Sequence, residues 1–416
     1  ERWRPRWLML GIGLAGICGA GYLLYKGDVF MSIARVVAIF CASLFAICLY
    51  CHSELYRRRP AARELTSFYF FVAGGGAIGA ILVGVVAPMV LAGNYELSMG
   101  LVFAAALGIA VTWNSGWVAR LFWAVVAGLT ITVVSDEMTA DQENNIYRSR
   151  NFYGTLDVTQ VVDTERHATV RTLYHGVIEH GQEVFRQDLR EMPSTYYGRN
   201  SGVGLAMDLC CDDRPRRIGV IGLGTGTMAA YGRAGDVIRF YDINPAVEPV
   251  ARTYFTYVRD SPAHVDVVND DARVSLAEEP PQRYDVIVLD AFSGDAIPVH
   301  LITIQALELY RRHLATGGIV AFHISNRYLS LGPVVQQLAD EAGMAAAFIS
   351  SDEDVPRDVF SSDWVLVTDN ARFLARPEVA GARSTIKMPR GLRLWTDDYN
   401  SLLPILRVRD ADTTSH

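Results

Sequence analysis

Charged residues are scarce in the first third of this 416-residue chain. A bilayer core requires about 20 apolar residues in a helix, and the mean hydropathy of the chain is positive, +0.17. The uncharged stretches therefore predict five membrane spans, at residues 7–25, 29–51, 67–93, 97–114 and 116–135. Only Arg35 is charged in the second of these, close to one end, where it could reach the interface. The alternative is a set of buried helices in a soluble bundle.

The sequence also lacks the marks of a metal site. Cys18, Cys41, Cys48 and Cys51 lie in or at the end of predicted spans, and the other two cysteines, Cys210 and Cys211, are adjacent. Adjacent cysteines are expected to be too strained for an ordinary disulfide. His175 and His180 have no third ligand at a suitable spacing. No metal is therefore expected.

Basic charge is lacking in the second part of the chain. Residues 1–135 hold ten lysines and arginines against five acidic residues, whereas residues 136–416 hold 28 against 40. An acidic soluble part excludes an ordinary nucleic-acid partner. It is compatible with a cationic substrate, although many acidic domains are merely soluble.

The basic loop HSELYRRRPAARELT gives the expected orientation of the spans. It carries Arg57, Arg58, Arg59 and Arg63, so the positive-inside rule places it in the cytoplasm. Counting five crossings from this loop puts the acidic part on the periplasmic side. If the fifth segment does not cross, the acidic part is cytoplasmic instead. The chain begins ERWRPRW without Met, so it is also expected to be a fragment of something longer.

The acidic part contains two different sequence patterns. Residues 147–205 contain alternating runs such as TLDVTQVVD, which predict a small antiparallel β domain. Residues 206–410 alternate strand and helix patterns, which predict a Rossmann-like α/β domain with a mostly parallel sheet. Its first strand, near Ile218–Ile221, runs into Gly222, Gly224 and Gly226. Glycines at such a turn let the backbone approach a ligand.

Three successive predicted strands then end in carboxylates. VIRFYD ends at Asp242, HVDVVNDD at Asp270 and Asp271, and YDVIVLD at Asp290. At this edge of an open parallel sheet, such acids bind ribose and base. Each acid could instead cap the following helix. A phosphate-binding GKS or GKT is absent. This favours a nucleoside sulfonium such as S-adenosylmethionine over a dinucleotide.

These motifs make the chain resemble the spermidine synthase (polyamine aminopropyltransferase) family, and more closely the bacterial membrane-fused spermidine-synthase-like proteins. The resemblance rests on these stretches, in order: CHSELYRRRPAARELTSFYFFVAGGGAIGA, RSRNFYGTLDV, LYHGVIEHGQ, PSTYYGRNSGVGLAM, VIGLGTGT, FYDINPAV, NDDARVSL, YDVIVLDAFSGDAIP and WTDDYNSLL. It implies a membrane helical bundle, a small β domain and a methyltransferase-like Rossmann domain. It also implies a multi-pass protein of the bacterial inner membrane, with a lipid bilayer as partner and a possible homodimer.

The resemblance implies specific roles. Asp242 would hold the ribose hydroxyls and Asp271 the adenine amino group, with Ile243 and Ala272 beside them. Asp290 would act as base toward the attacking amine. The other positions implied to matter are Glu179, which stands where the family has a glutamine that contacts the donor, Tyr196 and Tyr197 in the substrate cleft, and Asp397 and Asp398 in a late loop near the sheet edge.

Two positions depart from the family pattern. Thr225 replaces the acid of the glycine loop that helps to hold the aminopropyl amine. The acids of the gate loop, Asp290 and Asp295, are five residues apart instead of three. Asp295 is expected to bind the distal ammonium of the acceptor, with a plain turn residue as the alternative. His323, at the end of the fifth strand, is expected to be a satisfied core histidine.

Three functions follow as hypotheses. The first is a membrane-bound aminopropyltransferase that uses decarboxylated S-adenosylmethionine, transfers the aminopropyl group to an amine such as putrescine and releases methylthioadenosine. The second is a methyltransferase or another enzyme that uses S-adenosylmethionine or a related sulfonium. The third is a non-catalytic, nucleoside-binding membrane sensor.

Overall fold

The fold is seen in a computed structural model that describes residues 5–26, 33–140, 144–164, 166–292 and 297–407. Contacts between residues divide the chain into two compact units, residues 1–155 and 156–416. The division falls inside one β-strand, so it groups the first strand of the small sheet with the helices. The three domains expected from the sequence, a membrane helical domain at residues 1–138, a β domain at 147–205 and a Rossmann-like domain at 206–410, stay predictions.

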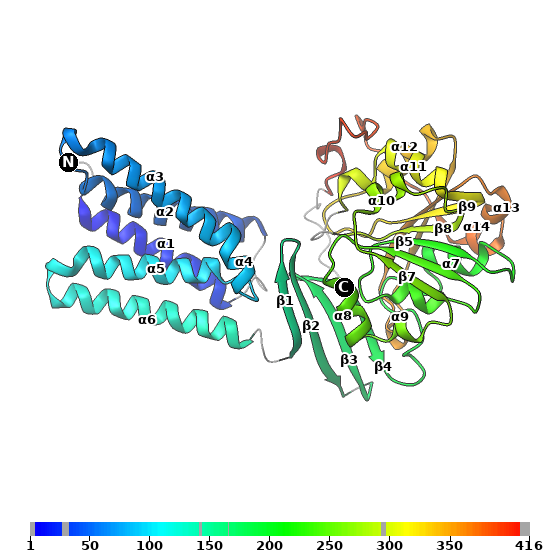
Figure 1. Cartoon of the computed structure of the whole chain (residues 1–416), viewed down its shortest axis with the longest axis horizontal. Helices are drawn as coiled ribbons and strands as arrows, with labels where there is room; N and C mark the ends of the chain where they lie inside the picture. The colour runs from blue at the N-terminus through cyan, green and yellow to red at the C-terminus, as the bar shows by residue number, and fades with distance from the viewer. Residues whose placement is uncertain (1–4, 27–32, 141–143, 165, 293–296, 408–416) are drawn as a thin grey trace. The chain divides into compact units, whose positions relative to one another are not determined.

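Five long helices fill the first unit, and all five are long and apolar enough to cross a membrane (Figure 1). They are α1 (Arg6–Lys26), α2 (Ile33–Arg57), α3 (Leu65–Ile81) with its continuation through Leu82–Val86 into α4 (Ala87–Val90), α5 (Glu96–Thr112) and α6 (Trp117–Ala140). The second helix runs to Arg57, past the expected limit at residue 51. That extension brings Glu54, which is 3% exposed, to within 3.1 Å of Arg6.

Close packing in this unit depends on glycines. A side chain at Gly108 would collide with Trp123 at 2.2 Å, and one at Gly13 would collide with Tyr50 at 2.6 Å. Small residues let helices approach in this way. The glycines of α3 at positions 74, 75, 76 and 79 do not serve such packing among the described residues, because a side chain built there would lie within 4 Å of no atom beyond the local helix backbone.

A four-stranded sheet has the order β1-β2-β3-β4. Its strands are β1 (Asn145–Asn151), β2 (Gly154–Asp163), β3 (Ala168–His175) and β4 (Ile178–Phe185). The pairs β2–β3 and β3–β4 are antiparallel, as the alternating sequence predicts. Within the first unit, Arg150 of β1 pairs with Glu96 at 2.6 Å.

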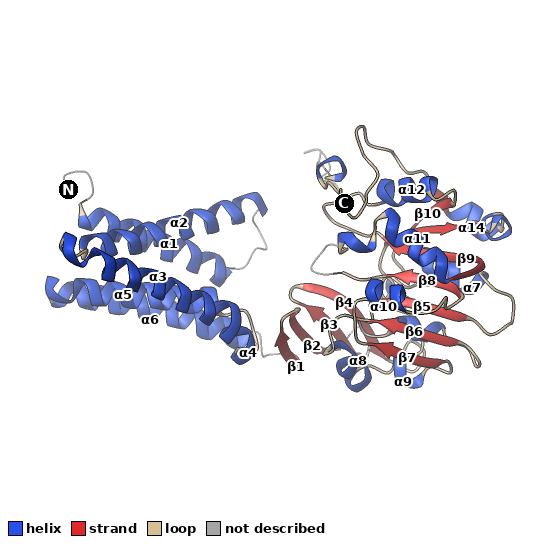
Figure 2. Ribbon diagram, turned by 45° about the horizontal axis from the view of Figure 1, so that its top comes forward, coloured by secondary structure: helices blue, strands red, loops and turns tan. Residues whose placement is uncertain are grey.

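The second sheet has eight strands in the order β12-β10-β11-β9-β8-β5-β6-β7 (Figure 2). The strands are β5 (Arg217–Ile221), β6 (Val237–Tyr241), β7 (His264–Val268), β8 (Tyr284–Leu289), β9 (Leu314–His323), β10 (Ala345–Ser351), β11 (Ser362–Thr368) and β12 (Arg383–Ser384). Strands β5 to β9 pair in parallel, and β11 is antiparallel to both β9 and β10. The predicted Rossmann-like α/β class is confirmed.

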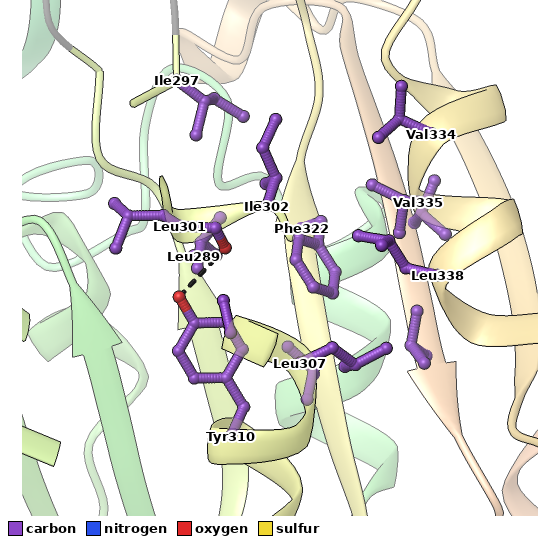
Figure 3. Packing of buried hydrophobic residues seen from close by; sticks show 14 of the residues in the cluster. Leu289, Ile297, Leu301, Ile302, Leu307, Tyr310, Phe322, Val334, Val335 and Leu338 are labelled. Atoms are coloured by element: carbon purple, nitrogen blue, oxygen red, sulfur yellow. Dashed lines mark hydrogen bonds between the residues drawn. The ribbon is translucent and has the colours of Figure 1, made fainter. Parts of the chain in front are cut away.

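Helices flank this sheet. They are α7 (Gly202–Leu209), α8 (Val247–Tyr254), α9 (Tyr257–Asp260), α10 (Ala272–Glu278), α11 (Ile304–His313), α12 (Gly332–Glu341), α13 (Ala371–Leu374) and α14 (Pro377–Ala382). On one face of the sheet, α11 and α12 bury a continuous apolar core against β8 and β9 (Figure 3). Tyr310 lies in that core and donates its hydroxyl to the Leu301 carbonyl at 3.0 Å. This core fixes the end of β8, where Leu289 is fully buried.

After α7 the adjacent Cys210 and Cys211 form a disulfide. Adjacent cysteines were expected to be too strained for an ordinary disulfide, whereas the structure pairs these two as a vicinal disulfide.

Candidate functional site

The glycine loop after β5 is built for close backbone contact. Gly222 has φ +101°, and a side chain there would lie 2.2 Å from the Asp290 carbonyl oxygen. Gly224 and Gly226 also have positive φ, +52° and +82°. Glycine adopts this region without the strain that other residues incur. The loop therefore requires glycine at these turns, and the first of them lets β5 and the end of β8 touch.

Strand β4 covers the glycine loop. A side chain on Gly181 would meet the Thr225 hydroxyl at 2.6 Å, and one on Gly224 would meet the His180 carbonyl at 2.8 Å. Thr225 is 1% exposed and shares a hydrogen bond with Thr227 at 2.7 Å. This position, expected in the cofactor set, is therefore a packed, neutral contact under β4.

Asp242 lies beside the loop, as predicted. Its carboxylate accepts the Leu223 N–H and the Asn244 N–H, both at 2.9 Å. Burial raises the pKa of this carboxyl, and the two backbone donors oppose that rise. Ile243, the next residue, is 46% exposed, so its side chain offers an apolar surface at the same edge.

Asp271 caps α10, as the alternative reading of these acids anticipated. Its side chain accepts the Arg273 and Val274 N–H groups, and Ala272 behind it is buried. Its second oxygen lies 3.1 Å from His300 Nε2. One oxygen of the Asp271 carboxylate thus caps the helix, and the other faces His300 at the sheet edge.

The late loop reaches the same neighbourhood. Asp397 forms an ion pair with Arg273 and accepts the Thr303 hydroxyl at 2.8 Å. The hydrogen bond from Arg273 holds the pKa of Asp397 below its ordinary range. Asp398 is exposed. The expected approach of this loop to the carboxyl ends of the strands is present in the structure.

Asp290 is the centre of a buried polar network at the end of β8. Its Oδ2 accepts the Tyr197 hydroxyl, and its Oδ1 lies 2.6 Å from His323 Nδ1. Burial and then the charge of Asp290 raise the pKa of Tyr197 well above its ordinary value, so Tyr197 stays a hydrogen-bond donor. The structure thus brings Asp290 and Tyr197, both expected in the site, into direct contact.

His323 was expected to be a core histidine with satisfied hydrogen bonds. It is buried, at 3% exposed, but its partners are functional candidates. Besides Asp290, its ring contacts the Ser325 hydroxyl through Nε2 at 2.9 Å and stacks on Trp364 at 4.5 Å. Sequence analysis did not identify Ser325 or Trp364. The available signal was the appearance of two polar residues, His323 and Ser325, where the apolar run of β9 ends.

Glu179 and His180, at the start of β4, are partly buried residues that each carry one buried polar atom without a partner among the described residues. Within the described part of the chain, Glu179 Oε1 and His180 Nε2 have no hydrogen-bond partner. Burial and the charge of Asp358 raise the pKa of Glu179 to about 7. Burial and the neighbouring His175 lower the pKa of His180 to about 4, so this imidazole is neutral at neutral pH. Such atoms are expected to meet a ligand or water.

Asp295, expected as a catalytic residue, lies outside the described residues, as does its neighbour Gly294.

The described residues contain no group of three or more His, Cys, Asp or Glu side chains arranged to hold a metal ion.

No family model matches the chain. Curated proteins do. It is 35% identical over 121 residues to the polyamine aminopropyltransferase of Vibrio vulnificus, covering 27% of this chain and 38% of that protein. It is 24% identical over 204 residues to a protein of Bifidobacterium longum named probable polyamine aminopropyl transferase, covering 48% of this chain and 42% of that protein. The chain thus spans less than half the length of either relative. A third relative, the N-terminal histidine N-methyltransferase of Emericella nidulans, is 33% identical over 109 residues, covering 25% of this chain and 19% of that protein.

Solved structures give two further comparisons. Spermidine synthase from Thermotoga maritima aligns with a TM-score of 0.41 and 12% identity, over 59% of this chain and 80% of that one. A probable spermidine synthase from Corynebacterium glutamicum aligns with a TM-score of 0.42 and 16% identity, over 60% of this chain and 98% of that one. The sequence relatives confirm the resemblance that the motifs predict: the chain is similar to the spermidine synthase (polyamine aminopropyltransferase) family.

Proposed function

We propose that the second unit binds decarboxylated S-adenosylmethionine and transfers its aminopropyl group to an amine such as putrescine, with release of methylthioadenosine. This is a step of polyamine biosynthesis. One observation carries the proposal. The neighbouring strands β8, β5, β6 and β7 end, in that spatial order, at Asp290, the glycine loop, Asp242 and Asp271. An adenosyl group laid along that edge would meet a base, a backbone turn and two ribose- or adenine-binding acids in sequence.

The residues divide the work as follows. Asp242 holds the ribose hydroxyls and already orders the glycine loop through Leu223. Asp271 receives the adenine amino group with the oxygen that α10 does not use, and Ile243 and Ala272 pack on the ring. Gly222, Gly224 and Gly226 supply the positive-φ turns that bring the loop backbone to the ligand, and Thr225 packs under β4.

The amine must lose a proton before it can attack carbon, because a free alkylamine is mostly protonated at neutral pH. Asp290, 11% exposed at its side chain, receives that proton. Positioning in line with the sulfonium supplies much of the remaining acceleration. Asp295, which lies outside the described residues, would hold the distal ammonium of the acceptor.

Glu179 supplies the donor site with an acid that Thr225 does not. It lies on β4 two residues before Gly181, the residue that touches Thr225. Its buried Oε1 has no hydrogen-bond partner among the residues that the structure describes. A donor ammonium there would complete the hydrogen bonding of that oxygen and favour its charged form.

A second candidate is a methyltransferase that uses S-adenosylmethionine. Two observations favour it: the neutral Thr225 in the glycine loop, and the relative named as an N-terminal histidine N-methyltransferase. The donors of the two reactions differ in one group: S-adenosylmethionine carries a carboxylate that decarboxylated S-adenosylmethionine lacks.

Isothermal titration of the purified full chain separates these functions. The proposal predicts binding of methylthioadenosine and tighter binding of decarboxylated S-adenosylmethionine than of S-adenosylmethionine. The opposite order would favour the methyltransferase. Donor binding without turnover of any amine in a panel would favour the non-catalytic sensor, and an absence of adenosyl binding would contradict all three.

We also propose that the five apolar helices hold the protein in the bacterial inner membrane as a multi-pass protein, with the second unit on the periplasmic side. The basic loop at Arg57–Arg59 supports this orientation, because basic loops stay in the cytoplasm. A homodimer is a further possibility that the resemblance supports.

A further inference from the structure

Asp290, His323 and Ser325 form one continuous chain of hydrogen bonds. His323 Nδ1 is 2.6 Å from Asp290 Oδ1, and His323 Nε2 is 2.9 Å from Ser325 Oγ. Ser325 Oγ in turn accepts the Asp363 N–H at 2.8 Å. The other oxygen of Asp290 accepts the Tyr197 hydroxyl. Every hydrogen-bonding atom of the imidazole therefore has a partner.

With Asp290 as a carboxylate and His323 as a neutral imidazole, the partners are compatible with one direction for each bond. An ionised carboxylate only accepts hydrogen bonds, so His323 Nδ1 must carry a proton and donate it to Asp290. A neutral imidazole then has an unprotonated Nε2, which accepts the Ser325 hydroxyl proton. This assignment leaves Ser325 Oγ with lone pairs for the Asp363 N–H, as observed. The network is thus consistent with one tautomer.

Packing holds the imidazole in this orientation. The ring stacks on Trp364 with 4.5 Å between centroids and an interplanar angle of 13°. Tyr196 and Phe292 approach it from two further elements, each at 5.1 Å between centroids. Rotation of the ring would break the stack and both polar contacts together. The orientation of Asp290 therefore depends on a ring that is itself fixed.

We infer that His323 is a positioning residue for the proposed transfer: its hydrogen bond fixes Asp290 Oδ1, while Ser325 sets the tautomer of His323. The inference rests on the proposed function. It assigns to the pair His323 and Ser325 a role that the sequence did not predict. In catalytic triads a carboxylate accepts the Nδ1–H of a histidine and orients that histidine for catalysis. Here the histidine orients the carboxylate, because the carboxylate is the group that meets the substrate.

The chemical step balances without a further reactant. The bound ammonium gives one proton to the Asp290 carboxylate and becomes a neutral amine. The nitrogen lone pair forms the new N–C bond as the C–S bond breaks, and the electron pair of that bond stays on sulfur in methylthioadenosine. The product leaves as an ammonium, and Asp290 returns its proton to solvent. His323 keeps its own proton throughout.

Nitrogen NMR tests the tautomer without any substrate. The full chain, labelled with ¹⁵N-histidine and held in detergent micelles, is compared with His323→Asn, which identifies the His323 signals by their loss. The expected result at neutral pH is a protonated Nδ1 and an unprotonated Nε2, with both signals displaced in Asp290→Leu. A protonated Nε2, or an imidazolium with both nitrogens protonated, would overturn the inference.

Two matched variants test the role. Asn places an amide nitrogen at the same number of bonds from the backbone as His Nδ1, and Gln places one where Nε2 lies. With decarboxylated S-adenosylmethionine and putrescine as the probe pair, His323→Asn is expected to keep at least a third of kcat. His323→Gln, which can reach Ser325 but not Asp290, is expected to lose at least tenfold.

The dissociation constant for methylthioadenosine should stay within threefold of wild type in both variants. Equal kcat for the two variants, or a loss of nucleoside binding that matches the loss of kcat, would overturn the positioning role. If wild-type protein binds no adenosyl compound, the proposed function fails, and the NMR result still decides whether His323 orients Asp290.

Discussion

At the scale of single residues, the acids at the strand ends do more than face a ligand. Asp242 accepts two backbone N–H groups, and Asp271 caps a helix. The two readings of each acid, structural and functional, are therefore compatible. A carboxylate has about four lone-pair sites, so it can order a loop with some and bind a nucleoside with the others.

Asp242→Asn tests the nucleoside role. A hydrogen bond to a charged group contributes about 1.5–3 kcal/mol. The variant should therefore bind methylthioadenosine at least tenfold more weakly, as measured by isothermal titration. Asp266→Asn, on the neighbouring strand and 47% exposed at its side chain, is the control and should bind normally. Equal affinity in all three proteins would remove Asp242 from the site.

Glu179→Gln tests the buried carboxyl. Burial and Asp358 raise the pKa of Glu179 from its ordinary value of 4.5 to about 7. A raised pKa contributes stability below the unfolded-state value, and that contribution is lost as the pH rises through the folded-state value. Glutamine stays neutral, so the variant should gain on the order of 1–3 kcal/mol relative to wild type at pH 8 and little at pH 4.

The measurement is the thermal unfolding midpoint across that pH range, where each kcal/mol corresponds to about 2–4 °C. Glu191→Gln, at an exposed position, is the matched control and should show no such trend. A constant difference between Glu179→Gln and wild type from pH 4 to pH 8 would mean that Glu179 ionises in the folded protein as it does in the unfolded chain.

At the scale of elements, the sequence predicted the parallel part of the sheet well. Strand β8 is buried along its whole length, so its run VIVL at residues 286–289 is continuously apolar and stops at Asp290. Strands β10 and β11 were not predicted, although β11 supplies Trp364 and its preceding segment supplies Asp358. Their place in the sheet depends on pairing with β9, which local sequence does not reveal.

The contact between β5 and β8 predicts a strong effect for Gly222→Ala. The new methyl group would lie 2.2 Å from the Asp290 carbonyl, and the backbone has φ +101°. The variant should lose at least about 3 kcal/mol of unfolding free energy, as steric overlap in a packed site does. Gly343→Ala shares a positive φ of +66° but has no described atom within 4 Å, so it isolates the backbone strain.

That control should lose only about 1 kcal/mol, the cost of a left-handed conformation. Chemical denaturation of the two variants compares these losses. If both lose the same amount, the close approach of the glycine loop to Asp290 contributes nothing, and the geometry of the site is less constrained than described.

At the scale of the whole molecule, composition alone indicated two parts of different chemistry. The apolar helices follow from charge-free runs, because a run of that length is long enough to cross a bilayer. The helix ends were less predictable. Glu54 looked like a loop residue, whereas it is 3% exposed and paired with Arg6 from another helix. A partly buried ion pair of this kind depends on a tertiary contact and leaves no local pattern in the sequence.

The predicted orientation of the chain in the membrane has a consequence for the supply of its donor. Sulfonium donors are made in the cytoplasm, so a periplasmic second unit would need exported donor. Fusions of alkaline phosphatase and of green fluorescent protein to the C-terminus decide the side. The charge count predicts an active phosphatase and a dark fluorescent protein. The reverse pattern would contradict the periplasmic placement: either one of the five apolar helices does not cross, or all five cross with the basic loop outside.

The most direct test of the whole account is methylthioadenosine release by the purified full chain, supplied with decarboxylated S-adenosylmethionine and a panel of amines that includes putrescine. The account predicts amine-dependent release by wild type, and at least a hundredfold less by Asp290→Asn, whose affinity for methylthioadenosine should be unchanged. Full release by Asp290→Asn would contradict it, because no other carboxylate is given the task of accepting the amine's proton.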